Sequence, residues 1–423
     1  MGSVVEINPF TRVEGHGNLK VYLDGSRVER VELCLSESPR LFEALLVGRS
    51  FAEVPQIICR ICSLCSTVLK VTALLALENA FGTAVSRVTQ LTRELILNGG
   101  QIQSHSLHLF CLLLPDLLDL QGVTDLARQA PDLLKSGLAI KRVGNLIQET
   151  AGGRLIHPVN LVLGGLGQRI PRDSLLCLRD ELDAIIPACA GAYLLFRSPF
   201  DFPPLPGPNY LALQEAGVPF SGHEFHTRDG HGFPVEAYRD FVVERVLPHS
   251  HAKSAQVFGQ HPCVGALARI NLGTPLGAGA RELLAKVQGE IIGQDMRGNA
   301  LAQAIELYQA AERARELVQE LLEIGREGEG NTTVQPGSGV GSAACEAPRG
   351  VLIQSYAFDS AGICTAADVI TPTSLNQGAL SGDLLALAHG MEGADSERLV
   401  GALERLIRCY DPCISCAVHL VRL

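Results

Sequence analysis

Two pairs of cysteines, one near each end of the chain, constrain the fold of this sequence more than any other feature. Cys62 and Cys65 form the first CxxC pair, and Cys413 and Cys416 form the second. Two intervening residues let both sulfur atoms of a pair face one point, and this spacing therefore recurs in metal sites. If the two pairs share one metal, the fold must bring residues 413–416 back beside residues 62–65.

Both pairs are predicted to lie at the start of a helix. The first pair leads into the helical pattern of residues 66–81, and the second follows Pro412, a residue favoured in a first helical turn. Amide groups at a helix N-terminus stabilise a thiolate relative to a thiol, so both pairs are suited to binding a metal ion.

The spacing alone leaves several interpretations open. A shared metal site, two separate roles and a redox dithiol are all compatible with two CxxC pairs. A zinc ribbon is disfavoured because its second pair normally follows the first closely, whereas 413 − 65 gives a separation of 348 residues here. A thioredoxin-like site is also disfavoured, since no βαβ pattern surrounds either pair.

The composition indicates a large protein whose main partner is not a nucleic acid. The chain has 423 residues with a formal charge of −10, no Trp and no basic stripe. The most apolar stretch, residues 107–120, contains Pro115, Asp116 and Asp119 and is shorter than the roughly 20 apolar residues of a membrane-spanning helix. The first ten residues lack the pattern of a signal peptide. We therefore expect a cytoplasmic protein without direct membrane insertion.

The remaining nine of the 13 cysteines are scattered, mostly among apolar neighbours. Without a secretion signal, a disulfide framework is not expected. We interpret these nine as small buried hydrophobic residues: Cys34, Cys59, Cys111, Cys177, Cys189, Cys263, Cys345, Cys364 and Cys409.

The periodicity predicts a mainly α fold, in which a large core of long helices carries small peripheral β-elements. A β-hairpin is expected at residues 18–35 around Asp24-Gly25, and short strands at 349–356 and 362–370. Residues 198–236 are expected to be irregular and residues 326–345 to form a loop. Helices are predicted at residues 66–81, 87–97, 101–120, 278–325 and 396–409, with a break at 98–100 and Ser396 as the N-cap of the last.

The residues around the cysteine pairs resemble a known family. Arg60-Ile61-Cys62-x-x-Cys65 and Asp411-Pro412-Cys413-x-x-Cys416-x-x-His419 together resemble the two signature motifs of nickel–iron hydrogenase large subunits. Four further segments match in the expected order: residues 12–16 (RVEGH), 264–269 (VGALAR), 346–350 (EAPRG) and 371–376 (TPTSLN). Residues 104–108 (SHSLH) and 113–116 (LLPD) look most like the cytoplasmic, bidirectional, NAD(P)-linked branch that includes the sulfhydrogenase α-subunits.

This resemblance implies a role for each of the four paired cysteines. Cys62 and Cys413 would be terminal ligands of nickel, while Cys65 and Cys416 would bridge nickel to an iron that carries carbon monoxide and cyanide. Soft thiolates suit such a centre, and H2 needs an open position on it. Cleaving H2 heterolytically releases a proton, which Cys413 would accept first and Glu14 would relay.

The resemblance also implies a set of surrounding residues. Pro348, Arg349 and Thr373 would line the cofactor, with Arg349 held over the active site by Asp411 and Thr373 bonding to a cyanide. A second, octahedral magnesium or iron site would tie the C-terminal segment into the core, with ligands from Glu43, the Val369 carbonyl and His419.

Three positions depart from the family pattern. Ser63 stands where Gly is common in the first motif, and Leu69 and Gln354 stand where His is usual. Such changes around the ligands leave the ligand set intact and bear on hydrogen bonding to the thiolates.

The resemblance therefore implies a single hydrogenase large-subunit domain over residues 1–423. Its parts would be an N-terminal hairpin at 1–36, a helical core at 66–325 and a C-terminal metal-ligand segment at 346–419. Electrons from H2 would leave through a small subunit that carries iron–sulfur clusters, because this chain has no further cysteine clusters, and then pass to flavin and NAD(P) subunits. The alternatives are a non-catalytic scaffold related to hydrogenases, a structural zinc protein and a thiol oxidoreductase.

Overall fold

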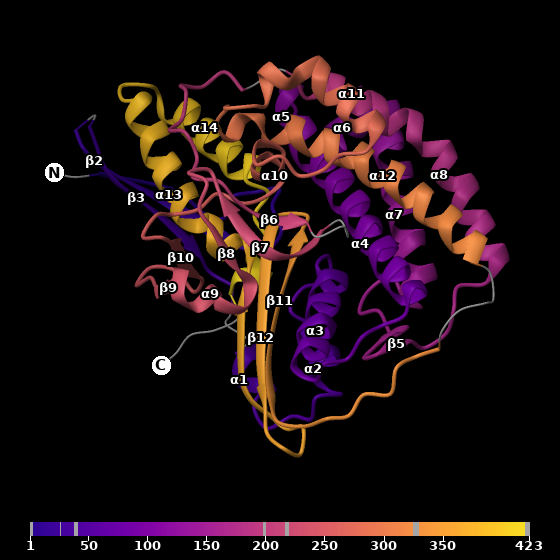
Figure 1. The fold of residues 1–423 in the computed structure, drawn as a ribbon. Helices are drawn as coiled ribbons and strands as arrows, with labels where there is room; N and C mark the ends of the chain where they lie inside the picture. Colours follow the sequence, from indigo (N-terminus) through magenta and orange to yellow (C-terminus); the bar gives the residue numbers. More distant parts are fainter. Residues whose placement is uncertain are drawn as a thin grey trace.

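Four long helices lie side by side and form the thickest layer of the molecule (Figure 1). The computed structural model describes residues 3–25, 27–37, 41–197, 200–215, 220–324 and 330–418. Within the layer, α4 packs against α7 and α12, and α8 packs against α7 and α12. The four helices are α4 (Arg87–Leu107), α7 (Pro131–Gly152), α8 (Arg172–Ala192) and α12 (Asn299–Ile324).

The central helix α4 is continuous, so the predicted break at residues 98–100 is wrong. Gly99 lies where α4 crosses α7, and a Cβ added to it would come within 2.7 Å of Ile147 Cγ2. Gly144 of α7 faces the same crossing, where its Cβ would lie 2.6 Å from the backbone nitrogen of Gln103. These glycines allow two helix backbones to approach closely, and the packing outweighs the low helix propensity of glycine.

Shorter helices connect this layer to the rest of the fold. Residue 107 leads from α4 into a π-helix, His108–Leu113, and then into α5. The other helices are α1 (Phe42–Leu46), α2 (Val54–Ile58), α3 (Ser66–Ala80), α5 (Leu114–Leu117), α6 (Val123–Gln129), α9 (Tyr238–Phe241), α10 (Ala266–Asn271), α11 (Ala278–Val287), α13 (Pro372–Gly390), α14 (Ser396–Cys409) and α15 (Ile414–Ala417).

The helical stretch predicted at residues 278–325 is interrupted. α11 ends at Val287, two short 3-10 turns follow, and α12 begins at Asn299. Gly293 has a φ of +74°, which α-helical backbone cannot accommodate. The predicted helix at 396–409 is confirmed as α14, but its N-cap is Asp395, whose side chain accepts a hydrogen bond from the Arg398 backbone nitrogen at 2.8 Å.

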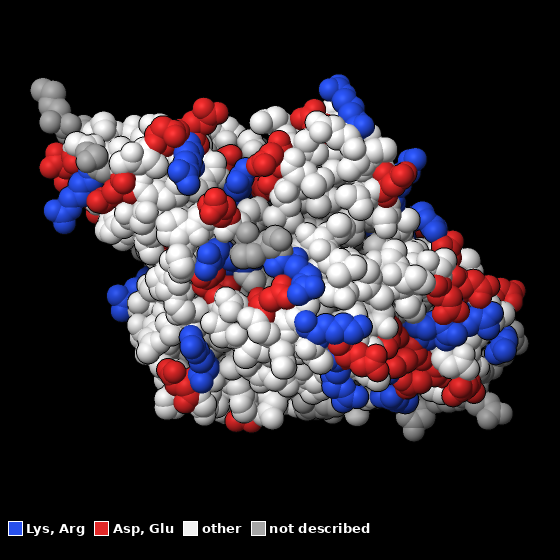
Figure 2. Space-filling view, turned by 90° about the horizontal axis from the view of Figure 1, so that it is seen from above, with Lys and Arg blue, Asp and Glu red and all other residues white. Residues whose placement is uncertain are grey.

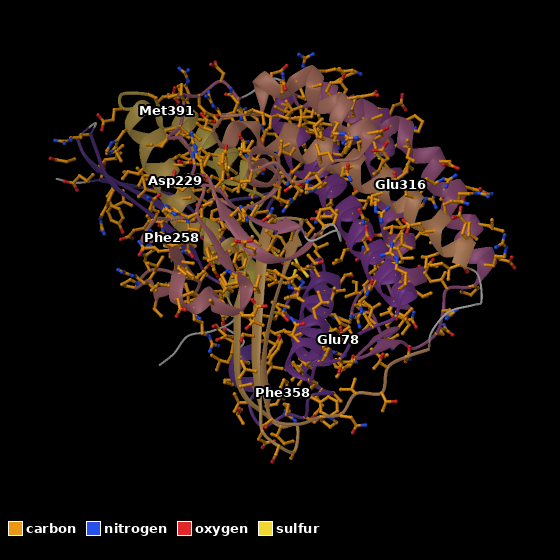
Figure 3. All side chains as sticks on the ribbon, viewed as in Figure 1. Glu78, Asp229, Phe258, Glu316, Phe358 and Met391 are labelled. Carbon is orange, nitrogen blue, oxygen red and sulfur yellow. The ribbon has the colours of Figure 1, made fainter. Side chains whose placement is uncertain are left out.

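An antiparallel sheet of six strands lies beside α3 (Figure 1). Its order is β13-β12-β11-β7-β6, with β8 paired to β7. Figure 3 shows side chains filling the space between α3 and the long strands, with Glu78 on the α3 side and Phe358 towards the end of β12. The strands are β6 (Leu211–Glu215), β7 (Ser221–Thr227), β8 (Gly232–Pro234), β11 (Gly339–Ala347), β12 (Gly350–Phe358) and β13 (Cys364–Ile370).

This sheet corrects two of the expectations from the sequence. Residues 198–236 contain three strands, and the segment predicted as a loop at 326–345 enters β11 at Gly339. The glycines there are a packing feature, because a Cβ at Gly339 would lie 2.4 Å from the Ala80 carbonyl oxygen and one at Gly341 would lie 2.0 Å from that of Ala76. The strands predicted at 349–356 and 362–370 are confirmed as β12 and β13.

The predicted N-terminal hairpin is confirmed and has a third strand. β2 (Gly17–Asp24) pairs with β3 (Arg27–Leu35), and β1 (Ser3–Ile7) pairs with the other edge of β2, both antiparallel. Two further antiparallel pairs are β4 (Leu161–Val162) with β5 (Gly165–Leu166) and β9 (Val242–Val246) with β10 (Lys253–Val257).

Acidic and basic side chains interleave on the surface where α8 and α12 lie, at the right of Figure 2. Ion pairs join neighbouring helices there, including Arg142 to Glu181 and Arg315 to Asp183 at 2.7 Å. Such exposed pairs contribute little to stability individually. Among the described residues, no helix is both long and apolar enough to cross a lipid bilayer.

Candidate metal centre

The two cysteine pairs meet in the interior of the protein. The sulfur atoms of Cys62, Cys65, Cys413 and Cys416 all lie within 4.8 Å of one another, and all four residues are buried. Cys413 Sγ is 3.5 Å from Cys62 Sγ, 3.7 Å from Cys65 Sγ and 2.8 Å from Cys416 Sγ. Of the open interpretations of the spacing, the geometry therefore supports one shared site.

The local backbone explains how residues 348 positions apart come together. Cys65 is the N-cap of α3 and Cys413 is the N-cap of the short helix α15, which confirms that each pair opens a helix. Residues 14 and 413 form a parallel β-bridge, in which the Ile414 nitrogen donates to the Glu14 carbonyl at 3.1 Å. Gly15 has a φ of +89°, and a Cβ there would lie 2.7 Å from Ile414 Cβ, so only glycine fits.

Arg349 is buried beside the sulfur cluster. It lies in the turn between β11 and β12, is 3% exposed, and points Nη1 at Cys65 Sγ over 3.8 Å. Its Nε donates to the Asp411 backbone oxygen at 3.1 Å and to Oδ1 at 3.2 Å. The structure thus brings Arg349 and Asp411 together as a buried ion pair, in which each holds the other in place.

Glu14 approaches the cluster from the N-terminal segment. Its Oε1 lies 3.8 Å from Cys62 Sγ, and its Oε2 accepts a hydrogen bond from the Ser415 nitrogen at 3.1 Å. Burial and the negative charge of Cys62 raise the pKa of Glu14, while hydrogen bonds from Ser415 and Cys413 act in the opposite direction. A half-buried carboxyl with a raised pKa next to sulfur accepts a proton more readily than an ordinary carboxylate.

Thr373 contacts the backbone of the cluster, and Pro348 directly precedes Arg349. The Thr373 hydroxyl oxygen, near the start of α13, accepts a hydrogen bond from the Cys413 nitrogen at 2.9 Å, which leaves its own hydrogen available to donate. The Pro348 carbonyl accepts from Arg269 Nη2 at 3.3 Å, so the backbone next to Arg349 is fixed.

The electrostatics of the four sulfurs suit a cation. Hydrogen bonds from Cys413 and Cys416 hold the pKa of Cys65 well below its usual value. Burial raises the pKa of Cys413 and of Cys416 well above theirs. Four thiols this close cannot all ionise unless positive charge lies among them, and a soft metal ion would provide it.

The predicted second metal site is described only in part. Glu43 is buried, and its Oε1 accepts a hydrogen bond from the Val369 nitrogen at 2.9 Å, so two of the three predicted ligand residues are neighbours. Lys253 Nζ lies 3.9 Å from the same oxygen. His419 lies outside the described residues.

The three departures from the family pattern have different environments. Ser63 is exposed, whereas Leu69 and Gln354 are buried against each other, with Gln354 Nε2 donating to the Leu69 carbonyl at 3.1 Å. Tyr356 donates its hydroxyl hydrogen to Gln354 Oε1 at 2.8 Å. The glutamine thus binds the backbone and a tyrosine of the sheet.

Most of the other cysteines are packing residues, as predicted. Seven of the nine are buried, but Cys177 is exposed and Cys34 is half-buried, so the expectation of burial is wrong for these two. Burial raises the pKa of the Cys189 and Cys345 thiols to about 12 each, which keeps them protonated and inert.

The sequence comparisons decide the family. The model of the family described as nickel-dependent hydrogenase matches residues 40–145 and 242–419, and one described as HoxL-like matches residues 4–36. The sulfhydrogenase 1 subunit alpha of Pyrococcus furiosus is 34% identical over 99% of this chain and 98% of its own length. This chain belongs to the nickel-dependent hydrogenase family.

Other relatives agree with this hydrogenase assignment and with the predicted branch. The sulfhydrogenase 2 subunit alpha of Pyrococcus furiosus is 34% identical over 99% of this chain and all of its own length. A solved NAD+-reducing NiFe hydrogenase in the H2-reduced state superposes with a TM-score of 0.89 at 27% identity, covering 99% of each chain. The Ni-Fe-Se hydrogenase of Desulfovibrio vulgaris Hildenborough shares the fold, with a TM-score of 0.81 at 22% identity over 99% of this chain and 100% of that one.

The hydrogenase is accordingly a catalytic large subunit, an oxidoreductase that acts on H2. The structure adds residues to which the sequence assigned no role. Arg269 is fully buried and binds Glu306 at 2.6 and 2.7 Å and Glu346 at 2.6 Å. The position of Arg269 inside the motif segment 264–269 could have marked it as a site residue from the sequence. Nothing in the sequence pattern marks Gln303, which donates to Asp411 Oδ2 at 3.2 Å.

Proposed function

We propose that this hydrogenase subunit cleaves H2 heterolytically and reversibly at a nickel–iron centre held by Cys62, Cys65, Cys413 and Cys416. The single observation that carries the proposal is the burial of all four sulfurs within 4.8 Å of one another. In the assignment implied by the family, Cys62 and Cys413 would hold the nickel, and Cys65 and Cys416 would hold both the nickel and an iron with carbon monoxide and cyanide ligands. When bound, this centre would supply the Lewis-acidic position that polarises H2.

The surroundings of the sulfurs support a catalytic centre over a structural zinc. A zinc-held terminus needs four thiolates and little else. Here a carboxyl group, Glu14, and a buried guanidinium, Arg349, both lie 3.8 Å from a cluster sulfur. Holding two such groups at a sulfur cluster costs desolvation energy. Such costly placements are concentrated at functional sites, and a structural zinc site does not need them.

The chain's own residues suggest a route for the proton. Splitting H2 gives two protons and two electrons, and the first proton needs a base at the site. Cys413 would accept it as a thiolate and pass it to Glu14, whose backbone forms a β-bridge with that of Cys413. The half-buried Glu14 would then pass the proton outward, while Arg349 keeps its positive charge beside Cys65 and orients H2.

The electrons require a partner. Among the described residues, the paired cysteines are the one group of three or more His, Cys, Asp or Glu side chains with metal-ligand geometry. We infer that an iron–sulfur small subunit accepts the electrons and that flavin and NAD(P) subunits follow. The relatives support this: two are named as alpha subunits, and the solved neighbour is NAD+-reducing. The resemblance to the NAD(P)-linked branch also carries the expectation of a cytoplasmic complex.

We also propose that Glu43, the Val369 carbonyl and His419 bind magnesium or a second iron. The hydrogen bond that the Val369 nitrogen donates to the buried Glu43 carboxylate supports this, because it makes these two residues neighbours. Oxygen ligands of this kind suit a hard cation.

The experiment that tests the main proposal is removal of one bridging sulfur. In the purified complex, Cys65→Ala should lose nickel and D2/H+ exchange together. Cys345→Ala is the matched control, because Cys345 is equally buried but lies in β11 outside the cluster. Wild-type exchange in Cys65→Ala would refute the ligand assignment, and equal losses in both variants would show only general damage.

A further inference from the structure

A buried ion cluster lies between the N-terminal segment and the helix that precedes the second cysteine pair. Asp116 of α5 forms an ion pair with Arg12 through Oδ1. It also accepts hydrogen bonds from Arg408 of α14, at 2.6 Å from Nε to Oδ2 and at 3.1 Å from Nη2 to Oδ1. The side chains of Asp116 and Arg408 are buried, and that of Arg12 is 16% exposed. One carboxylate thus joins two arginines from opposite ends of the chain.

The same two arginines also bind backbone carbonyl groups. Arg12 Nη1 donates to the Leu112 carbonyl oxygen at 2.8 Å, in the π segment that precedes α5. Arg408 Nη1 donates to the Thr11 carbonyl oxygen at 2.9 Å. The Thr11 nitrogen donates to Glu404 Oε1 of α14 at 3.1 Å. Residues 11 and 12 are therefore held both by the π segment with α5 and by α14.

The backbone at Arg12 is strained. Its φ is +59°, in the left-handed region that residues with a side chain rarely adopt. Such a conformation persists only where the surroundings determine it, and it occurs preferentially at functional sites. The Phe10 nitrogen donates to the Gly17 carbonyl at 3.1 Å, which closes the loop that contains Arg12. Within this loop the chain turns at Arg12 and reaches the sulfur cluster two residues later, at Glu14.

Glu14 is the residue whose position depends on these contacts. Two residues span at most about 7 Å of chain, so fixing Arg12 leaves Glu14 little freedom. The Glu14 backbone forms the β-bridge with Cys413, and its Oε1 lies 3.8 Å from Cys62 Sγ. Arg408 in turn precedes Cys413 by five residues. The ion cluster therefore holds both sides of the bridge, the segment that carries Glu14 and the segment that carries Cys413.

Stability alone does not explain this cluster. Burying charges costs desolvation energy, and replacing a buried ion cluster with apolar side chains is often neutral or stabilising. What the cluster provides is orientation, because a guanidinium forms several hydrogen bonds in fixed directions. Glu404 Oε2 lies 3.8 Å from Arg408 Nη1 and adds a second carboxylate, so the two positive charges of the cluster are balanced.

We propose that Arg12, Asp116 and Arg408 form a clamp that holds the Glu14 carboxyl beside Cys62, and that proton transfer at the site depends on this clamp. The three are positioning residues, which bind one another and backbone carbonyls and act on the reaction through Glu14. The role in proton transfer rests on the function proposed above, whereas the placement of Glu14 by the clamp does not.

The placement is tested by crystal structures of the purified complex. Arg12→Gln removes the ion pair with Asp116, so Glu14 Oε1 should withdraw from Cys62 Sγ by about 1 Å or more, the scale of misplacement that impairs catalysis. Arg12→Lys keeps the charge but not the planar fork and should show a smaller displacement. An unchanged position of Glu14 in Arg12→Gln would overturn the clamp, whatever the activity.

Arg93→Gln is the matched control for these variants. Arg93 is buried and, like Arg12, binds one carboxylate and one backbone carbonyl. Its partners are Glu78, at 2.6 and 2.7 Å, and the Val162 carbonyl oxygen, at 3.0 Å. Because Glu78 lies in the last turn of α3, at the opposite end from Cys65, this variant should leave Glu14 in place.

The role in proton transfer is tested by two reactions of the same complex. Converting para-H2 to ortho-H2 requires only that H2 is split and formed again, whereas D2/H+ exchange also requires that protons reach the solvent. Arg12→Gln should lower D2/H+ exchange about tenfold or more and keep most of the para–ortho conversion. Arg12→Lys should recover part of the exchange, and Arg93→Gln should change neither reaction.

A double-mutant cycle shows whether Arg12 acts through Glu14. If it does, Arg12→Gln combined with Glu14→Gln should exchange no more slowly than Glu14→Gln alone. Multiplicative losses in the double variant, or equal losses of both reactions in Arg12→Gln, would overturn the role in proton transfer. A nickel-free wild type that converts no para-H2 would instead overturn the proposed function and leave the crystal structures as the test of the clamp.

Discussion

Replacing Arg269 with methionine should destabilise the protein strongly and in a pH-dependent way. Burial alone would raise the pKa of Glu306, but the charge and hydrogen bonds of Arg269, with a smaller effect from His105, outweigh burial and lower that pKa from 4.5 to about 2. At about 1.4 kcal/mol per pH unit, this corresponds to about 3 kcal/mol of stability. Because the folded-state pKa is lowered, the contribution is complete above pH 4.5 and is lost as the pH falls towards 2.

The variant removes the larger part of this contribution, which comes from Arg269, and leaves Glu306 and Glu346 buried without that cation. Glu346, whose pKa is already raised by burial, loses its ion pair as well. Breaking a buried pair costs about 3–5 kcal/mol. For a chain of this length, with about 1–2 °C per kcal/mol, the melting temperature should fall by roughly 3–10 °C at pH 7.5. The loss should be smaller at pH 5.5, where the unpaired carboxyls can take up protons.

The assay is the melting temperature of the assembled complex at pH 5.5, 6.5 and 7.5, measured at one scan rate because unfolding of a large complex is commonly irreversible. Arg315→Met is the matched control, since its pair with Asp183 is exposed and should contribute less than about 1 kcal/mol. Equal losses in Arg269→Met and Arg315→Met, or a loss that does not vary with pH, would refute the reasoning.

Three further changes have outcomes that follow from the structure. Glu14→Gln should retain nickel but lower D2/H+ exchange by about 10²-fold or more, because the proton loses its acceptor; unchanged exchange would place the proton route elsewhere. Asp383→Asn should be more stable than the wild type at pH 7.5 but not at pH 4. Burial raises the pKa of Asp383 from 3.8 to about 6, so the wild type loses stability as the pH rises through this range. The amide can still accept the hydrogen bond from the Tyr410 hydroxyl, which lies 2.7 Å from the wild-type carboxylate. Melting temperatures across pH measure this, and parallel curves for the two proteins would contradict it. Gly144→Ala should lower the free energy of unfolding by about 1–3 kcal/mol, because its Cβ would lie 2.6 Å from a backbone nitrogen of α4. In the control Gly191→Ala the Cβ meets nothing within 4 Å, so this variant should keep its stability. Equal melting temperatures of the two variants would refute the close crossing of α4 and α7.

The sequence predicted the helices that follow the two CxxC pairs more accurately than it predicted several of the other elements. Each CxxC pair is a local pattern whose geometry hardly depends on the rest of the chain, and both pairs start helices as expected. That they meet, with Arg349 and Glu14 beside them, depends on contacts between segments hundreds of residues apart. The spacing of the cysteines could not show this, whereas the resemblance of the motifs to the hydrogenase family implied it.

The errors in the predicted fold have a common cause. Glycine breaks helices by its intrinsic preference, so a break at residues 98–100 and a loop at 326–345 were reasonable expectations. In the structure, a neighbouring element instead comes too close for a side chain at both sites: the Ile147 side chain at Gly99 and the Ala76 backbone at Gly341. Close approach is a tertiary property, and a single sequence does not distinguish it from flexibility. The same holds for Gln303, whose importance lies in its hydrogen bond to the buried Asp411.

The measurement that tests the central claim most directly is metal analysis of the anaerobically purified complex, counting nickel, iron and zinc per large subunit. We predict about one nickel per chain, with iron in addition, and the loss of nickel in Cys65→Ala but not in Cys345→Ala. Zinc alone at the four cysteines, or fully assembled protein without nickel, would contradict the account.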